Sequence, residues 1–341
     1  MRFVEPALVR AEKLFAKRLP GEEARRAAKD RLVADVAGDG VPAADLVIEA
    51  IFENREAKQT LYQQLEPRMR ADAVLATNTS SIPLQELLTG LKDPQRFIGL
   101  HFFNPVAKLP LIEVVQTSST STAAMDGGLA FARQIGKLPV PCQSQPGFLV
   151  NRILAPYMAE ALELAREGVP IAEIDHAAVD FGMPMGPVEL ADSVGLDIAL
   201  SVARILGPVI GRPAAPELEK LVEAGHLGQK SGRGFYLYHD GRPVRPRGGG
   251  GEVRAEVQDR LVLSFLNEAA DCLAEGVVAD ADLIDAGVIF GTGFAPFRGG
   301  PLHYARERGI HTIVSQLQGF EQRLGARFAP SAGWQRLGIA G

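Results

Sequence analysis

The sequence predicts an α/β unit followed by an all-α part. Between residues 45 and 143, short apolar runs alternate with segments of helical periodicity, which indicates a largely parallel sheet covered by helices. From residue 146 the pattern is helical, and it recurs in a weaker form beyond residue 252. We therefore expect a sheet domain over residues 1–145 and two tandem helical domains over residues 146–241 and 252–341.

Residues 5–32 predict two amphipathic helices ahead of the sheet. The chain breaks at the Pro-Gly pair at 20–21, and Leu8 and Leu14 share one face while Lys and Arg occupy the opposite one. A solvated surface hairpin is the simplest interpretation of this pattern.

The sheet region predicts five strands with helices between them. The first strand reads DLVIEA, which is almost entirely apolar, as expected of a strand buried on both faces. We expect strands over 45–50, 73–78, 96–102, 111–116 and 138–143, and helices over 53–69, 83–91 and 122–136.

A glycine-containing stretch at residues 38–43, GDGVPA, formally matches the dinucleotide-binding pattern G-x-G-x-x-G/A. That pattern binds a pyrophosphate only where it joins a strand to the N-terminus of a helix. Here a strand follows instead of a helix, so the match does not predict a phosphate site.

The helical region begins after Pro146-Gly147, a plausible domain boundary, and contains an internal repeat. Residues 280–291 (DADLIDAGVIFG) resemble residues 171–182 (IAEIDHAAVDFG), and FRGGPLHYARERG further along resembles MGPVELADSVG. Between the two copies, RPVRPRGGGG at 242–251 predicts a flexible linker.

Composition excludes several classes of protein. The chain has 341 residues, 46% hydrophobic and 23% charged, which is ordinary for a globular protein. A net charge of -5 argues against nucleic acid and anionic membranes as partners. No apolar run reaches the length of a membrane span, and the N-terminus lacks the pattern of a signal peptide. Cys142 and Cys272 lie far apart, which indicates reduced residues of a cytoplasmic protein without a metal site.

The clearest candidates for chemistry lie on two expected strands that flank Asn104-Pro105. One strand ends near His101 and the other carries Glu113. A His held by a carboxylate is a common general base near neutral pH. Upstream, Asn78 and Ser80 follow a buried strand in a hydroxyl-rich loop, where they could reach a ligand.

The sequence around these residues resembles the L-3-hydroxyacyl-CoA dehydrogenase family, including the dehydrogenase part of the multifunctional fatty-acid oxidation α-subunit of bacteria. Seven motifs carry the resemblance in the family's order, from about Asp45 to Tyr236. They are DLVIEAIFEN (45–54), ATNTSS (76–81), GLHFFNPV (99–106), LIEVV (111–115), PGFLVNR (146–152), MPMGPVELAD (183–192) and GQKSGRGFY (228–236).

The resemblance implies a partial, doubly wound Rossmann-like sheet and an NAD-dependent oxidation of L-3-hydroxyacyl-CoA to 3-oxoacyl-CoA. It implies that His101 is the general base, that Glu113 orients it, and that Lys and Arg side chains of the N-terminal hairpin approach the coenzyme A phosphates. Two further residues would contact the substrate, with the cofactor as an alternative partner of Ser80, and five would contact NAD. The substrate residues are Ser80 and Asn151, and the NAD residues are Glu53, Lys58, Asn78, Asn104 and Lys230.

Each of these assignments has a simpler structural alternative. Glu113 could be a charge on an edge strand, Ser80 a loop cap, and Asn151 a helix cap. Glu53 and Lys58 could form a solvated turn, and Lys230 could belong to a plain polar loop.

The chain departs from the family at its beginning. The family opens with a strand, a Gly-rich turn, a helix and a second strand that ends in an acidic residue, and none of these precedes Asp45. The strand at 45–50 would then lack a neighbour, and the main pyrophosphate site would be absent. We expect either a fragment of a longer gene product or a wrongly assigned start at Met1. A multifunctional parent would carry an enoyl-CoA hydratase domain upstream.

The expected partners are an acyl-CoA substrate and either a second copy of the chain or a thiolase subunit of a β-oxidation complex. The main alternative is a non-catalytic acyl-CoA-binding or dimerising module that has lost half of its cofactor site. A third possibility is a dehydrogenase of short hydroxy acids that does not use coenzyme A.

Overall fold

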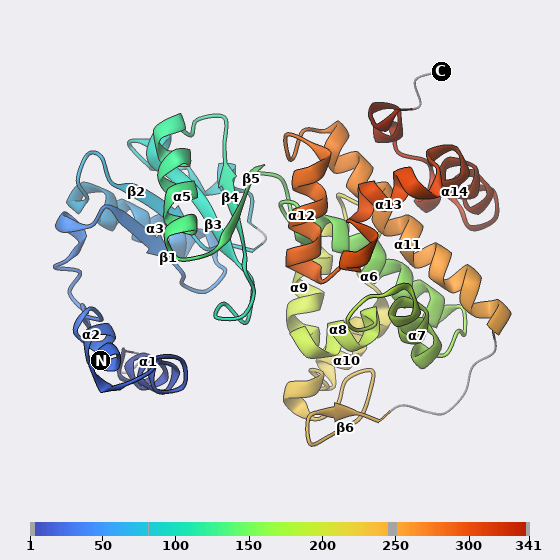
Figure 1. Ribbon diagram of the computed structural model, residues 1–341, viewed down its shortest axis with the longest axis horizontal. Coiled ribbons are helices and arrows are strands. Elements are labelled where there is room, and N and C mark those ends of the chain that lie inside the picture. Colours follow the sequence, from blue (N-terminus) through green and yellow to red (C-terminus); the bar gives the residue numbers. More distant parts are fainter. Residues whose placement is uncertain (1–3, 81, 245–250, 339–341) are drawn as a thin grey trace.

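The computed structural model describes residues 4–80, 82–244 and 251–338. Figure 1 shows two bodies, a helix-covered sheet formed by the N-terminal part and a larger body of helices formed by the rest. The predicted class, α/β followed by all-α, is confirmed. Among the described residues, no helix combines the length and the apolar character that crossing a bilayer requires.

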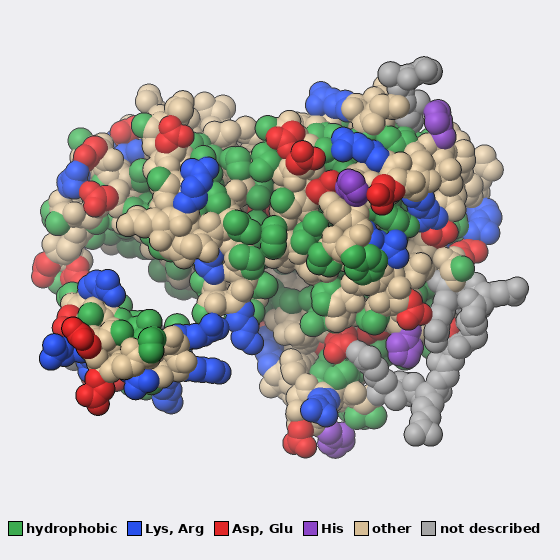
Figure 2. Space-filling model, viewed as in Figure 1, with side chains coloured by type: hydrophobic (Ala, Val, Ile, Leu, Met, Phe, Trp, Pro, Cys, Tyr) green, Lys and Arg blue, Asp and Glu red, His purple; other side chains and the backbone are tan. Residues whose placement is uncertain are grey.

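The chain begins with a helical hairpin, α1 (Val4–Arg18) and α2 (Glu22–Asp30). Neither helix has a buried residue, and Figures 1 and 2 show the hairpin standing away from the sheet with Lys and Arg side chains on its surface. Gly21 joins the helices with φ 77°, a conformation that favours glycine. The hairpin is therefore a solvated surface element.

The sheet has the strand order β1-β2-β3-β4-β5. Strands β1, β2 and β3 run parallel, β4 is antiparallel to β3, and β5 is parallel to β4. The carboxyl ends of the first three strands therefore meet at one edge of the sheet. The strands are β1 (Leu46–Glu49), β2 (Val74–Thr77), β3 (Phe97–Phe102), β4 (Leu111–Gln116) and β5 (Leu138–Gln143).

The expectation that β1 is buried on both faces is wrong. Ile48 is 36% exposed, and Glu49 alone of the four strand residues is buried. The reason is position, because β1 is the outermost strand and no described strand pairs with its outer edge. The stretch before β1 forms a 3₁₀ turn, η1 (Val41–Ala43), and not the strand-to-helix turn of a dinucleotide site.

Helices cover both faces of the sheet. On one face, α5 (Thr122–Gln134) packs its Ala124 and Met125 against Ile98 and Val114. On the other face lie α3 (Arg55–Leu65) and α4 (Leu84–Leu87), and the Tyr62 and Phe97 rings meet with centroids 5.3 Å apart. The helix α4 has a single turn and is shorter than the predicted helix over 83–91. Short 3₁₀ turns η2 (Glu66–Arg68) and η3 (Pro94–Arg96) lead into the next strands.

The helical body contains two similar groups of helices, which we name repeat 1 (α6–α9) and repeat 2 (α11–α13). Repeat 1 comprises α6 (Val150–Arg166), α7 (Ile171–Phe181), α8 (Pro187–Val194) and α9 (Leu196–Leu206). Repeat 2 comprises α11 (Gly251–Ala274), α12 (Ala281–Thr292), η5 (Pro296–Arg298) and α13 (Pro301–Arg308). After repeat 1 come α10 (Pro216–Glu223), η4 (Gln229–Ser231), β6 (Tyr238–His239) and β7 (Arg242–Pro243), and after repeat 2 come α14 (Ile310–Leu324), η6 (Ala326–Phe328) and η7 (Ala332–Leu337).

The predicted linker at 242–251 differs in part from the structure. Its first two residues form β7, which pairs with β6. Residues 245–250 of the expected linker lie outside the described residues.

The two repeats share a helix cap that is specified by sequence. Asp175 of α7 accepts hydrogen bonds from two amide groups in the first turn of α8, at 2.8 and 3.1 Å, and Asp285 of α12 does the same for α13, at 2.7 and 3.0 Å. Gly186 and Gly300 precede α8 and α13, and a Cβ on either would come within 2.3 Å of the capping Asp. The Asp-to-Gly-Pro pattern in both copies therefore reflects the same close contact.

The repeats pack on each other through reciprocal ion pairs between α6 and α11. Each helix contributes an Arg that binds two Glu residues of the other repeat, at equivalent positions. The pairs are Arg152 with Glu268 and Glu275, and Arg260 with Glu160 and Glu167. Such reciprocity is the pattern of a two-fold interface. The repeats therefore contact each other as two copies related by a pseudo-two-fold axis.

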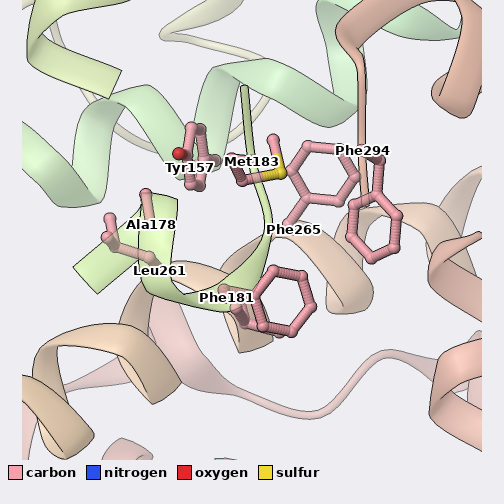
Figure 3. Close-up of a pocket in the computed structure, with 8 residues that line it drawn as sticks. Tyr157, Ala178, Phe181, Met183, Leu261, Phe265 and Phe294 are labelled. Atoms are coloured by element: carbon pink, nitrogen blue, oxygen red, sulfur yellow. The ribbon is translucent and has the colours of Figure 1, made fainter. Parts of the chain in front are cut away.

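An aromatic core fills the space between the repeats (Figure 3). The Phe265 ring of α11 packs against Tyr157 of α6 and against Phe294, with centroids 5.7 and 5.4 Å apart, and Phe181 of α7 meets Phe294 at 5.5 Å. These rings surround a cavity of about 10 Å³, large enough for about one water molecule. The interface between the repeats is thus packed like the interior of a single domain.

Candidate active site

The central feature of the site is the pair His101 and Glu113. The two residues are directly opposite each other in the β3–β4 ladder, so their side chains leave the sheet on the same face. His101 Nδ1 lies 2.5 Å from Glu113 Oε2, Glu113 is fully buried, and His101 is 5% exposed. A carboxylate at Nδ1 orients the ring with its proton on that nitrogen, which leaves Nε2 able to accept a proton.

Glu113 is also held by the start of α6. Its second oxygen, Oε1, accepts the amide N–H groups of Leu149 at 3.0 Å and Val150 at 2.9 Å. The first N–H groups of a helix have no partner inside the helix and favour negative charge. The helical body therefore stabilises the charge on Glu113 and fixes the carboxylate that orients His101.

Two aromatic rings enclose His101. Phe103 lies 4.5 Å from the imidazole centroid, and Phe148 meets the imidazole edge-on at 5.6 Å. Phe148 is fully buried and has φ 51°, a left-handed conformation that is costly for a residue other than glycine. Gly147 precedes it with φ 76°. The strained backbone at Gly147 and Phe148 places both the Phe148 ring and the first amides of α6 next to the His101–Glu113 pair.

A hydrogen-bonded group links the carboxyl ends of β1 and β2 to α6. Glu53 accepts hydrogen bonds from Thr79 Oγ1 at 2.5 Å and from the Ser80 amide at 3.0 Å. Asn151 Nδ2 donates to the Ser80 carbonyl at 3.2 Å. Burial raises the pKa of Glu53, but the bonds from Thr79 and Ser80 and the nearby Lys58 outweigh it and hold that pKa below its usual value. The Ser80 loop is therefore fixed from two sides.

Asn78 lies between this group and the His101 strand. Its side-chain oxygen accepts the backbone N–H of Phe102 at 3.2 Å. The structure thus brings Glu53, Asn78, Ser80 and Asn151 to the same edge of the sheet as His101. Their roles toward a ligand stay predictions.

Lys58 does not form the solvated turn that was the structural alternative, and its role toward NAD stays a prediction. It is completely buried, and its Nζ lies 2.7 Å from Glu49 and 3.4 Å from Glu53. Glu49 also accepts hydrogen bonds from Tyr62 at 2.6 Å and Thr77 at 2.8 Å. The residue is part of a buried polar network that supports Glu53 and is not part of a solvated turn. Glu49 was not predicted from the sequence as a partner of Lys58. Its position, as an acidic residue at the end of an apolar strand, was the feature that could have indicated it.

Asn104 is exposed in the loop after β3, and its peptide bond to Pro105 is cis. Lys137 holds this loop by donating to the carbonyls of Val106 and Leu109. Because Asn104 follows the carboxyl end of β3, it lies at the same edge of the sheet as His101.

Lys230 of η4 lies elsewhere. Its Nζ pairs with Asp197 of α9 at 2.5 Å, and its side chain is 45% exposed. The contacts of Lys230 belong to the helical body, not to the strand ends.

Comparison with known families identifies this arrangement. Residues 5–145 match the model of the 3-hydroxyacyl-CoA dehydrogenase, NAD binding domain, and residues 147–238 match that of the 3-hydroxyacyl-CoA dehydrogenase, C-terminal domain. The chain belongs to the 3-hydroxyacyl-CoA dehydrogenase family. Its sheet matches that family's NAD-binding domain.

Among curated relatives, the fatty acid oxidation complex subunit alpha of Shewanella amazonensis is 38% identical over 346 aligned residues, which cover 96% of this chain and 49% of that protein. The chain thus spans about half the length of the curated relatives it matches.

Solved structures of the family differ in how much of the chain they match. The 3-hydroxybutyryl-CoA dehydrogenase of Escherichia coli K12 is 25% identical with a TM-score of 0.86, and the match covers 98% of this chain and 90% of that one. The (S)-3-hydroxybutyryl-CoA dehydrogenase of Ralstonia eutropha is 35% identical with a TM-score of 0.64, and the match covers 70% of this chain and 86% of that one. The first match therefore extends through repeat 2, whereas the second leaves part of this chain unmatched.

Proposed function

We propose that the chain catalyses the NAD-dependent oxidation of L-3-hydroxyacyl-CoA to 3-oxoacyl-CoA in fatty-acid β-oxidation. The observation that carries the proposal is the buried His101–Glu113 pair at the edge of an NAD-binding sheet. The name of the Shewanella relative, a subunit of a fatty acid oxidation complex, supports the substrate class.

In this mechanism His101 is the general base. Its Nε2 takes the proton of the C3 hydroxyl, and Glu113 stabilises the imidazolium that forms. NAD, when bound, supplies the acceptor for the hydride that leaves C3. Phe103 and Phe148 shield the imidazole from water, and Ser80 and Asn151 hold the substrate oxygen.

The strand ends fit the nicotinamide half of the cofactor. Glu53, Asn78 and Asn104 follow the carboxyl ends of β1, β2 and β3, where open α/β sheets bind their ligands. Lys58 would act indirectly, by holding Glu53, and Lys230 would need an anionic group of the ligand to reach the helical body. Among the described residues before β1, no glycine-rich turn joins a strand to a helix, so these residues do not supply a diphosphate cradle.

We further propose that the chain works as the dehydrogenase portion of a longer enzyme, with domains over 1–145, 146–241 and 252–341 and a cytoplasmic location. A thiolase subunit is the proposed partner, because the relatives are named as subunits of a complex. A homodimer would have to use a face other than α6, which α11 already covers.

Replacement of His101 by Ala tests the mechanism. We expect turnover of acetoacetyl-CoA with NADH to fall about 10²–10⁴-fold, since a general base contributes that much. His311→Ala is the matched control, because His311 is exposed on α14. A His101→Ala variant with near-normal turnover would exclude His101 as the base.

The outer edge of β1, with which no described strand pairs, favours one alternative, a non-catalytic module that binds acyl-CoA. Titration calorimetry with acyl-CoA and with NADH separates the two functions. Binding of acyl-CoA without measurable affinity for NADH would support the module.

A further inference from the structure

The helix α12 of repeat 2 contacts the residues that surround Glu113, although it is distant from them in sequence. It is the helix of repeat 2 that lies beside the sheet in Figure 1. Gly287 and Gly291, one turn apart, share the face of α12 that makes this contact. Both positions allow the helix backbone to approach closely because glycine has no Cβ.

The two glycines lie against side chains from β4 and from the start of α6, the two elements that meet at Glu113. A Cβ at Gly291 would lie 2.7 Å from Val150 and 2.9 Å from Leu111 of β4, and a Cβ at Gly287 would lie 2.8 Å from Leu149. Leu149 and Val150 are the residues whose amides bind Glu113. The glycine face of α12 thus packs against the side chains of the two residues whose backbone amides bind the carboxylate.

The same part of repeat 2 is also attached to the sheet by a backbone hydrogen bond. The Gln143 amide of β5 donates to the Val277 carbonyl, which precedes α12, at 2.8 Å. All of the side chains at the contact are at least nine-tenths buried, so the packing leaves little room for independent movement.

We propose that α12 positions the His101–Glu113 pair, with Gly287 and Gly291 as the positioning residues. The helix sets where the Leu149 and Val150 amides lie, these amides set where Glu113 lies, and Glu113 orients His101. Repeat 2 is then a component of the dehydrogenase site as well as a packing partner of repeat 1. The inference rests on the proposed function only for its kinetic consequence, because the hydrogen bond to His101 is a structural feature.

The test compares Gly291→Ala and Gly287→Ala with Gly319→Ala. Gly319 lies within α14 and is exposed, with nothing within 4 Å of an added Cβ, so it is the matched control for a Gly-to-Ala change in a helix. The direct readout is the downfield proton resonance of the His101 Nδ1–H···Glu113 bond, assigned by its loss in His101→Ala. The second readout is kcat and KM with acetoacetyl-CoA and NADH.

Gly291→Ala should shift or broaden the His101 resonance and lower kcat about tenfold with little change in KM, since small displacements of catalytic groups cost rate. The Gly287→Ala methyl group would clash with the flexible end of Leu149 and make ordinary contact with Val140, so it should shift the resonance less. The Val150→Ala change added to Gly291→Ala removes the nearer clash and leaves the one with Leu111 at 2.9 Å, so it should restore both readouts in part. The control should match the wild-type chain.

Folded Gly291→Ala and Gly287→Ala variants with the wild-type resonance and kcat would overturn the proposal, and loss of stability alone would reduce α12 to a packing element. If Gly291→Ala does not fold, the resonance of Gly287→Ala decides. If the wild-type chain shows no turnover but the resonance moves as expected, the positioning role stands and the proposed function fails.

Discussion

At the scale of single residues, Glu113 joins the sheet to the helical body. One of its oxygens binds His101 and the other binds two amides at the start of α6, so three of the roughly four acceptor sites of the carboxylate are used. Replacing it by an amide would keep its shape and change its hydrogen bonding. This makes Glu113→Gln an informative substitution.

We expect Glu113→Gln to lower kcat on the order of 10²–10⁴-fold. The Gln carbonyl can still accept both amides, but its NH₂ would face His101 Nδ1 and favour the tautomer with the proton on Nε2, which cannot act as a base. Steady-state kinetics beside thermal unfolding checks this. A kcat within a few-fold of the wild-type value would contradict the assigned role of Glu113.

The sequence was most informative for residues whose side-chain type and neighbours in the sequence indicate a role. It predicted that His101 and Glu113 belong together, because both belong to a recognisable string on adjacent strands. It could not predict the amide donors Leu149 and Val150, since a backbone N–H leaves no trace in residue type. The burial of Lys58 also escaped it, because the partner Glu49 comes from an edge strand and the network closes only in the folded sheet.

At the scale of elements, the aspartates that cap α8 and α13 make the stability of the fold depend on pH. Burial raises the pKa of Asp175 to about 6, against the opposing hydrogen bonds from Tyr236 and the amides of α8. Burial likewise raises the pKa of Asp285 to about 6, against the amides of α13. Both carboxyls therefore bind a proton more readily in the folded chain than in the unfolded chain, where the value is about 3.9.

Because these pKa values are raised on folding, the stability gained from the two carboxyls is fully present below about pH 4 and is lost as the pH rises through about 6. We expect the free energy of unfolding of the wild-type chain, relative to Asp175→Asn/Asp285→Asn, to fall by roughly 2–3 kcal/mol per carboxyl between pH 4 and 7. Urea unfolding at several pH values measures this difference, with the exposed Asp282→Asn as control. Parallel pH curves for the wild type and the double variant would contradict the expectation.

The limits of sequence reasoning differ between elements. The alternation of strands and helices was predicted because the spacing of apolar residues along the chain shows which side chains are buried. The repeat was predicted because its Asp and Gly-Pro positions recur. The exposure of β1 was missed because its apolar sequence predicts burial on both faces, although the lack of a neighbouring strand was expected. The predicted helix over 83–91 is reduced to the single turn of α4, and Gly90, with φ 90°, lies in the turn that follows it.

At the scale of the whole molecule, charged side chains buried between the repeats link them. Glu160 is fully buried and pairs with three arginines, of which Arg212 comes from the segment after repeat 1, Arg260 from α11 and Arg327 from η6. Removing its charge would take away the carboxylate that pairs with the largely buried Arg212 and would leave Arg260 and Arg327 with Glu167. A buried pair with one partner missing is far more costly than an exposed pair.

We expect Glu160→Gln to lower the free energy of unfolding by about 3–5 kcal/mol. Glu219→Gln, which breaks the exposed pair with Arg204, should cost no more than about 1 kcal/mol. Chemical unfolding followed by circular dichroism gives both values. Equal effects of the two substitutions would show that the buried cluster does not stabilise the contact between the repeats.

The pseudo-two-fold contact between α6 and α11 has a further consequence for behaviour on dilution. In a dimer of separate chains, the equivalent contact dissociates as the protein concentration falls, and stability then depends on concentration. Here both halves belong to one polypeptide, so the local concentration of each for the other is set by the chain itself. The α12 helix therefore stays beside the His101–Glu113 pair at any protein concentration, and specific activity should be constant from micromolar to picomolar enzyme.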